Sequence, residues 1–116
     1  MTAGRYDIIV EQGATWSRTM TVADDGAPRD LNGYTIRMQA RPRHSSEQVI
    51  VALTTGDGIT ISDPPNGVFE LLLTALQTAA LPVVSGARYD LELVDGDGVV
   101  TRLLEGTFTV SPEVTR

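Results

Sequence analysis

Hydrophobic and polar residues alternate with a period of two along most of this chain. The clearest example is the stretch 34–41, in which Ile36, Met38 and Ala40 alternate with polar side chains. Alternation of this kind is typical of a β-strand with one buried and one exposed face. Turn sequences rich in Gly, Asp, Asn and Pro interrupt the pattern about every 8 to 12 residues, which is typical of a β-sandwich or barrel. The pattern therefore predicts an all-β protein.

The alternating stretches place the individual elements. We expect strands at residues 5–11, 15–23, 34–41, 49–53, 59–62, 68–74, 88–94 and 99–110. The only helical candidate is 75–81, which follows a candidate N-cap at Thr74 and precedes Pro82. A chain of 116 residues is long enough for one hydrophobic core. We therefore predict a single domain over residues 1–116, an immunoglobulin-like antiparallel β-sandwich of about 7–9 strands with one short helical turn.

The strand expected at 15–23 has an interrupted apolar face. Trp16, Met20 and Val22 share this face, and Arg18 lies between them. The stem of an arginine can cover apolar surface while its guanidinium reaches water, so we expect Arg18 at the edge of a sheet.

Three other stretches carry specific expectations. The stretch 68–74 is almost wholly apolar and is expected to be a buried strand. The Asp-Gly-Asp-Gly sequence at 95–98 predicts the turn of a hairpin between the last two strands. The irregular apolar pattern around Leu103 and Leu104 predicts a β-bulge near Gly106.

The overall composition restricts the class of partner. The formal net charge is −6 at pH 7, so the long-range field of the protein repels phosphate and we expect no nucleic-acid partner. No apolar run approaches the roughly 18 residues that a membrane helix requires, and residues 1–7 contain no apolar segment of the secretory type. We expect no membrane partner, and a protein that is made in the cytoplasm and leaves it only as part of an assembly.

The residues available for nucleophilic catalysis are few. His44 is the only histidine, and the chain contains no cysteine. Ser45 and Ser46 follow His44 directly and are too close in sequence for the usual geometry of a nucleophile and its base. We interpret this segment as a solvent-facing loop, name no catalytic residue, and predict that the protein is not an enzyme.

Metal and nucleotide sites also lack the required pattern. The 95–98 sequence resembles the start of a calcium loop, but Val100 stands where the loop requires glycine and Gly106 stands where it requires glutamate. One histidine without any cysteine does not make a zinc site. The glycines lie at turns and form no phosphate-binding loop between a strand and a helix. We therefore predict no metal and no cofactor.

Two groups of charged residues remain to be interpreted. Arg37, Arg41, Arg43 and His44 form a local basic patch that could contact an acidic partner, although a solvated strand face is the interpretation we favour. Three glutamates occupy outward strand positions, and we interpret them as solubilising rather than as paired catalytic carboxylates: Glu70, Glu92 and Glu105.

Several segments together resemble a known family. They are QGAT at 12–15, DLNGYT at 30–35, GITI at 58–61, GVF at 67–69, YDLEL at 89–93 and EGTFTV at 105–110. In these segments the chain resembles the small immunoglobulin-like virion proteins of tailed bacteriophages and prophages, and it is similar to the N-terminal domain of the phage baseplate upper protein. The resemblance extends from about residue 12 to residue 110, and each motif consists of a strand and its turn.

The resemblance implies a structural role in a virion and no catalytic residues. The expected function is that of an adaptor or anchoring module of the tail, baseplate or neck/fibre region, located in the virion after assembly in the bacterial cytoplasm. The expected partners are other virion proteins and copies of the chain itself in a symmetric assembly. They would bind through strand edges and through the extended ends 1–6 and 111–116.

Two other functions remain as alternatives. One is a capsid decoration, or cement, protein. The other is a receptor- or carbohydrate-binding module, for which Trp16 and Tyr34 are the available stacking platforms, although we expect Trp16 to lie in the core. A small hydrolase is the least favoured class.

Overall fold

The period-two pattern forms strands along nearly the whole chain. The computed structural model describes residues 3–115. Each of the expected strands overlaps an observed one, and the all-β prediction is confirmed. The strands are β1 (Gly4–Arg5), β2 (Ile8–Glu11), β3 (Trp16–Thr21), β4 (Ala23–Asp24), β5 (Ala27–Pro28), β6 (Thr35–Arg41), β7 (Val51–Thr55), β8 (Gly58–Asp63), β9 (Val68–Leu73), β10 (Val84–Val94) and β11 (Val100–Ser111). The helical elements are η1 (Pro64–Asn66) and α1 (Ala75–Ala79).

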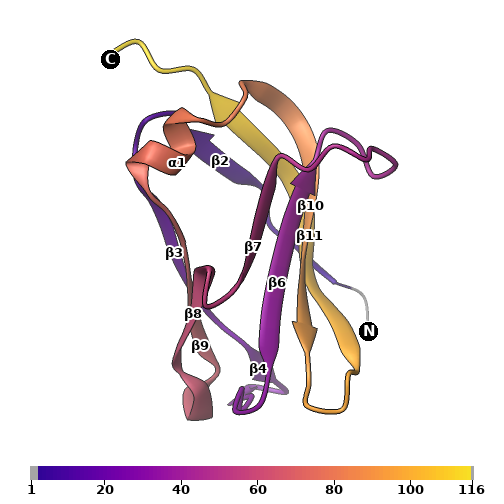
Figure 1. Ribbon diagram of the computed structural model, residues 1–116. Coiled ribbons are helices and arrows are strands. Elements are labelled where there is room, and N and C mark those ends of the chain that lie inside the picture. Colours follow the sequence, from indigo (N-terminus) through magenta and orange to yellow (C-terminus); the bar gives the residue numbers. More distant parts are fainter. Residues whose placement is uncertain (1–2, 116) are drawn as a thin grey trace.

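Nine of the strands formed by residues 3–115 belong to one mixed sheet. Its order is β1-β11-β10-β6-β7-β8-β9-β3, and β2 also pairs with β11. The sheet curls so that β6, β10 and β11 form one layer and β3, β8 and β9 face them from the other, which gives the predicted sandwich-like form (Figure 1). The short strands β4 and β5 make a separate hairpin. A strictly antiparallel sandwich was expected, but β1 and β2 pair with β11 in parallel, and so do β7 and β8 with each other.

Strand β6 and the hairpin formed by β10 and β11 follow the prediction closely. Strand β6 alternates buried and exposed residues from Thr35 onward, and β10 pairs with it along seven residues. The turn at 95–98 joins β10 to β11, and the Asp95 side chain accepts hydrogen bonds from the amides of Asp97 and Val99, at 2.8 and 2.9 Å. Asp-Gly sequences favour such a turn because its backbone requires residues with positive φ, as Gly98 has here.

The bulge expected near Gly106 lies at Leu103. The register passes from Leu91 opposite Leu104 to Glu92 opposite Arg102, so Leu103 is the extra residue. Gly106 itself is regularly paired with Tyr89. The reason for a glycine is a close approach of another strand, since a Cβ at this position would lie 2.4 Å from the Tyr6 carbonyl oxygen.

The N-terminal stretch forms two strands and not one. The strand is interrupted between β1 and β2, where the Tyr6 amide donates to the Glu105 carbonyl at 3.0 Å. Gly106, which lies opposite Tyr89, has no side chain, and the Tyr89 hydroxyl donates to the Tyr6 carbonyl there. Burial raises the pKa of Tyr89, so its hydroxyl stays protonated and remains a donor. Arg5 belongs to the sheet, as the strand expected at 5–11 requires, and Gly4, expected in the extended end, belongs to it as well. Residues 1–2 of that expected end lie outside the described part.

Strand β9 corrects the expectation of a wholly buried strand. Phe69, Leu71 and Leu73 are buried, but Glu70 and Leu72 between them are exposed. The strand lies between β8 and β3, and its second face is covered by no further layer among the described residues, so it alternates like a half-buried strand.

The helical prediction is confirmed in position and cap, although α1 is shorter than expected. The Thr74 hydroxyl accepts from the Gln77 amide at 3.2 Å, and the Gln77 side chain accepts from the Thr74 amide at 2.8 Å, which completes a capping box. Thr78 is fully buried, and its hydroxyl accepts from the Gly13 amide at 3.0 Å and donates to the Ala14 carbonyl at 2.9 Å. This side chain ties α1 to the turn between β2 and β3.

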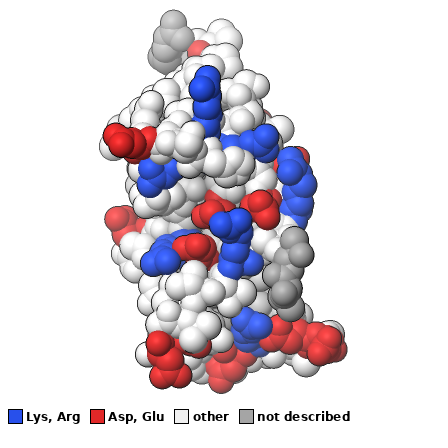
Figure 2. Space-filling model, turned by 90° about the vertical axis from the view of Figure 1, so that its right-hand side faces the viewer, with Lys and Arg blue, Asp and Glu red and all other residues white. Residues whose placement is uncertain are grey.

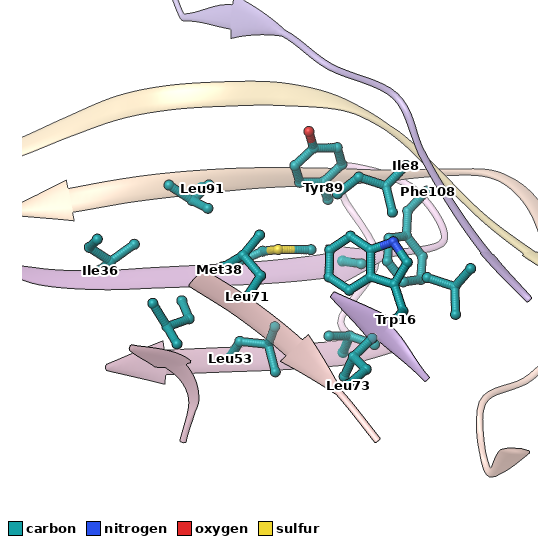
Figure 3. Packing of buried hydrophobic residues seen from close by; sticks show 14 of the residues in the cluster. Ile8, Trp16, Ile36, Met38, Leu53, Leu71, Leu73, Tyr89, Leu91 and Phe108 are labelled. Atoms are coloured by element: carbon teal, nitrogen blue, oxygen red, sulfur yellow. The ribbon is translucent and has the colours of Figure 1, made fainter. Parts of the chain in front are cut away.

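One cluster of buried side chains fills the space between the two layers. Phe69 comes from one layer and Phe108 from the other, and both are fully buried. Trp16 belongs to this cluster and lies opposite Leu73 of the neighbouring strand β9, as expected for a core residue (Figure 3).

Candidate functional site

The outer face of β6, β10 and β11 carries four of the charged residues that the sequence analysis singled out, namely Arg37, Arg41, Glu92 and Glu105. Arg37 and Arg41 lie on this face, as their spacing predicts. Arginine and carboxylate side chains are interspersed over it, so it is a mixed surface rather than a basic one (Figure 2). The acidic side chains come from β10 and β11, which pair next to β6.

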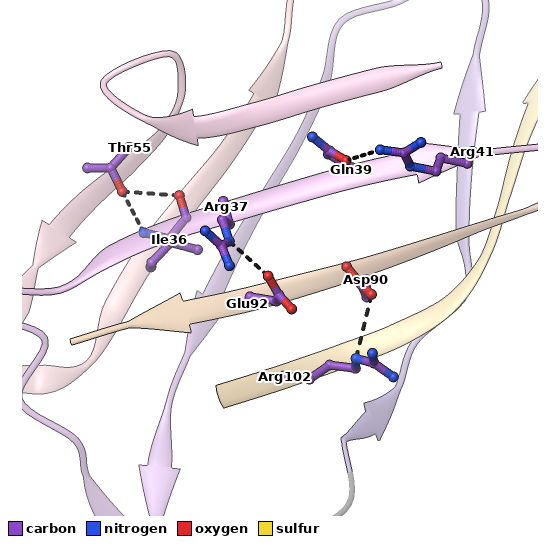
Figure 4. Close-up of polar contacts among 8 residues, drawn as sticks. All are labelled: Ile36, Arg37, Gln39, Arg41, Thr55, Asp90, Glu92 and Arg102. Carbon is purple, nitrogen blue, oxygen red and sulfur yellow. Dashed lines mark hydrogen bonds and ion pairs between the residues drawn. The ribbon is translucent and has the colours of Figure 1, made fainter. Parts of the chain in front are cut away.

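Ion pairs and hydrogen bonds occupy these arginines (Figure 4). Arg37 Nε lies 2.8 Å from Glu92 Oε1, and Arg102 Nε lies 3.5 Å from Asp90 Oδ2. Arg41 donates to Gln39 Oε1 at 2.9 Å. Of the expected basic patch, Arg37 is therefore ion-paired within the sheet, and Arg41 is hydrogen-bonded to neutral groups of its own strand and of the following loop.

Asp90 has the most perturbed carboxyl on this face. Burial and the neighbouring Glu92 raise its pKa above the ordinary value, and Glu105 acts in the same direction. Arg102 and His44 act in the opposite direction. A shallow hollow brings Asp90 near His44 and Glu105, but these groups sit beside several arginines and form no hydrogen bond with one another among the described residues.

The loop around His44 is organised by backbone contacts. Arg41 Nη1 donates to the carbonyls of Ser46 and Glu47 at 2.8 and 3.2 Å, and the Ser46 hydroxyl accepts from the Arg43 amide at 3.2 Å. His44 and Ser45 are exposed. Within residues 3–115 no hydrogen bond joins His44 to either serine, so the structure brings no nucleophile and base together here.

The two aromatic residues considered for carbohydrate stacking are not exposed platforms. Trp16 is buried, and Tyr34 packs against the core while it interacts with Arg29. Trp16 Nε1 is buried without a hydrogen-bond partner in the described part of the chain.

The end of the molecule near α1 gathers segments that are distant in the sequence (Figure 1). Gln12 connects them, because its side chain donates to the Leu81 carbonyl at 3.0 Å and accepts from the Glu113 amide at 3.1 Å. The sequence does not indicate this role, since a glutamine before Gly13 is typical of an ordinary turn. Gln12 holds the segment after β11 against the loop after α1.

Three large apolar side chains are exposed on the segments joined at this end. Leu76 of α1 is 83% exposed, Val83 is 55% exposed and Val114 is 90% exposed. We call Leu76, Val83 and Val114 the apical apolar group. A contiguous exposed apolar surface typically marks a contact with another protein, so these three side chains at one end of the molecule are candidates for such a contact.

A second candidate surface is the open edge of β3. Arg18 lies on this terminal strand, as its interruption of the apolar face predicts. Its guanidinium carbon lies 5.2 Å from the centre of the Trp16 ring, and its Nε donates to the Tyr6 hydroxyl at 3.0 Å.

The fold defines the chain as an all-β, sandwich-like protein. No protein-family model matches the chain, and no curated protein matches it. None of the helices formed by residues 3–115 has the length and apolar character needed to cross a membrane. Over the same residues, no three His, Cys, Asp or Glu side chains are grouped so that they could hold a metal ion.

Proposed function

We propose that this protein is a non-enzymatic structural component of a bacteriophage particle, which binds other virion proteins as an adaptor or anchoring module of the tail, baseplate or neck/fibre region. The resemblance over residues 12–110 supports this class. The observation that carries the binding role is the apical apolar group, which Gln12 holds on ordered segments at one end of the molecule.

The dispersal of reactive groups also favours binding over catalysis. His44 is exposed on a loop, and Arg37, Arg41 and Arg102 of the outer face are engaged with carboxylates or an amide of the same sheet. A binding module needs only a rigid scaffold that presents a surface, and a sandwich with one shared core provides it.

The first test is whether the chain is part of the particle. Particles purified from a culture of the bacterium that carries the gene should contain the protein in fixed stoichiometry by mass spectrometry. Particles that lack it would refute the virion role. A tagged copy supplied in the same culture then allows variants to be compared for incorporation.

The second test concerns the apical apolar group. Val83→Glu should lower incorporation about tenfold, because a charge would be buried against the partner. Val99→Glu is the matched control, since Val99 is similarly exposed, at 59%, but lies in the β10–β11 hairpin at the other end (Figure 1). Equal incorporation of the two variants would show that the partner binds elsewhere.

A further inference from the structure

Strand β3 ends the sheet and leaves one of its edges open. It pairs with β9 on one side, and within residues 3–115 no strand pairs with its other side. The next residue along, Val22, lies opposite Gly67, and its amide donates to the Gly67 carbonyl at 2.8 Å. Bonded positions alternate along an antiparallel pair, so the even positions from 16 to 22 turn their backbone groups to β9. Positions 17, 19 and 21 therefore turn their N–H and C=O groups to the open edge.

A hollow separates this edge from the opposite end of the sheet. Met20 lines it from β3, and Leu103 and Leu104 line it from β11. All three side chains are only partly buried against the core. Across the hollow, the Arg18 side chain reaches the Tyr6 hydroxyl. Side chains and not backbone pairing thus close this side of the sandwich.

The charges around the hollow are positive, although the protein as a whole is acidic. Arg5 and Arg18 line it, and none of the described residues that line it is acidic. Arg5 is paired with Asp7 at 3.2 Å, but Arg18 forms no ion pair within residues 3–115. Arg18 Nη1 instead donates to the carbonyl of Ser17 at 2.7 Å, on the open edge itself.

The charge of Arg18 favours one kind of partner strand at this edge over another. An inward-pointing charge on an edge strand disfavours pairing with a second copy of the same strand, because the two guanidinium groups would be brought together. A strand that carries a carboxylate at the facing position has no such penalty and gains a charge-assisted contact.

We propose that the open edge of β3 and the adjoining hollow bind an extended segment of another protein, which adds as a strand, sets apolar side chains against Met20 and Leu104, and places a carboxylate against Arg18. Backbone hydrogen bonds to positions 17, 19 and 21 provide affinity, and the alternate side chains provide specificity. The proposal rests on the proposed function in one respect, that this protein acts by binding other proteins.

A selection from a displayed library of random octapeptides, with the full chain as target, tests the proposal. Enriched peptides should alternate apolar and polar residues and carry Asp or Glu at a central position. Thr19→Pro removes the outward N–H without touching the β9 ladder, and should weaken their binding about tenfold. Thr19→Val retains the N–H and is the matched control, expected within about twofold of wild type.

Equal binding by Thr19→Pro and Thr19→Val, or the absence of any enriched peptide, would overturn the proposal. Should Thr19→Pro fail to fold, hydrogen exchange of the wild-type chain tests strand addition at the β3 edge instead. The amides of 17, 19 and 21 should become protected when peptide binds, and unchanged exchange at these positions would refute strand addition. Arg18→Gln should weaken acidic peptides while leaving neutral variants of the same peptides unchanged.

The particle experiment separates this proposal from the proposed function. Wild-type chain present in particles together with undiminished incorporation of folded Thr19→Pro would overturn the β3 site and leave the virion role intact. Peptide binding that depends on Thr19 in a chain absent from particles would support the β3 site and refute the virion role. A wild-type dimer that Thr19→Pro abolishes would identify a second copy as the occupant and overturn the proposal.

Discussion

The outer faces of the two layers differ in how their polar side chains are engaged. On the face of β6, β10 and β11, cross-strand ion pairs join Arg37 to Glu92 and Arg102 to Asp90. On the face of β3, β8 and β9, the one corresponding cross-strand contact formed by residues 3–115 is a long hydrogen bond of 3.5 Å from Thr19 to Glu70. The first layer is linked across three strands by its own side chains, whereas the second ends in an open strand.

This difference separates what stabilises the domain from what is available to a partner. Exposed ion pairs contribute little each, about 0.2 to 1 kcal/mol, so the linked face adds little to stability. Both layers bury their inner faces in the same cluster, and most of the stability comes from there. The open β3 edge is therefore a surface that can change its contacts without loss of the core.

The largest expected effect tests whether the two layers form one cooperative unit. Phe69→Ala in one layer and Phe108→Ala in the other should each lower the free energy of unfolding by about 3 to 5 kcal/mol, because each removes a fully buried ring. Denaturant unfolding followed by fluorescence and circular dichroism should show a single transition in both variants. Separate transitions for the two layers would contradict a shared core.

A smaller effect is expected where β1 meets the first layer. Gly106→Ala should cost about 1 to 3 kcal/mol, since its Cβ would lie 2.4 Å from the Tyr6 carbonyl and would displace the segment between β1 and β2. Gly96→Ala is the control, because its nearest neighbour would be the Gly33 carbonyl at 3.9 Å. Thermal melting of both variants gives the comparison, and an unchanged Gly106→Ala would show that β1 adjusts freely.

The contact between α1 and the turn that joins β2 to β3 depends on the buried hydroxyl of Thr78. Thr78→Val keeps the shape but leaves the Gly13 amide and the Ala14 carbonyl without their partner, at a cost of about 1 to 3 kcal/mol. Thr60→Val, on the exposed face of β8, should change stability by less than about 0.5 kcal/mol. Equal melting of the two variants would mean that water replaces the lost contacts.

The smallest effects concern two carboxyls with opposite pH dependence. The pKa of Asp90 is raised by burial, so the folded state binds this proton more tightly and the carboxyl's contribution becomes more favourable as the pH falls through the raised pKa. The pKa of Asp7 is lowered by hydrogen bonds from Thr107, so its contribution is present at neutral pH and is lost as the pH falls through the lowered pKa.

The two asparagine variants should therefore move in opposite directions. Asp90→Asn should slightly stabilise the protein at pH 7, with a gain that shrinks toward pH 4. Asp7→Asn should destabilise it at pH 7, with a loss that shrinks on acidification. Urea unfolding of both variants and wild type from pH 3 to pH 8 measures this. Destabilisation by Asp90→Asn at neutral pH would show that its ion pair with Arg102 outweighs burial.

Local patterns predicted those features that depend on neighbours in the sequence. Strand β6, the hairpin turn at 95–98 and the Thr74 cap were anticipated because a two-residue period, an Asp-Gly turn and a capping residue act within a few positions. Arg18 was placed at an edge because a charged side chain within an apolar face must reach water, which an edge strand allows. For the candidate surfaces, the sequence indicated Arg18 and the end 111–116 that carries Val114, but not Leu76, Val83 or Gln12.

Features that depend on distant partners were not predicted. The irregular pattern around Leu103 and Leu104 did indicate a bulge, which was placed near Gly106 and lies at Leu103. Nothing near Gly106 in the sequence indicates that Tyr6 passes within contact of it. Leu72 was expected inside because its stretch is apolar, and it is exposed because no layer covers that face of β9. The link from Gln12 to Leu81 and Glu113 spans most of the chain.

The sequence by itself determined that this chain forms strands and where most of them turn, since side-chain alternation and turn chemistry are local properties. The tertiary structure alone decided that β1 and β2 lie parallel to β11, that the sheet curls into two layers, and that β3 is left at its end. Pairing between strands about 100 residues apart depends on which closure buries the common core, and no local pattern encodes that choice.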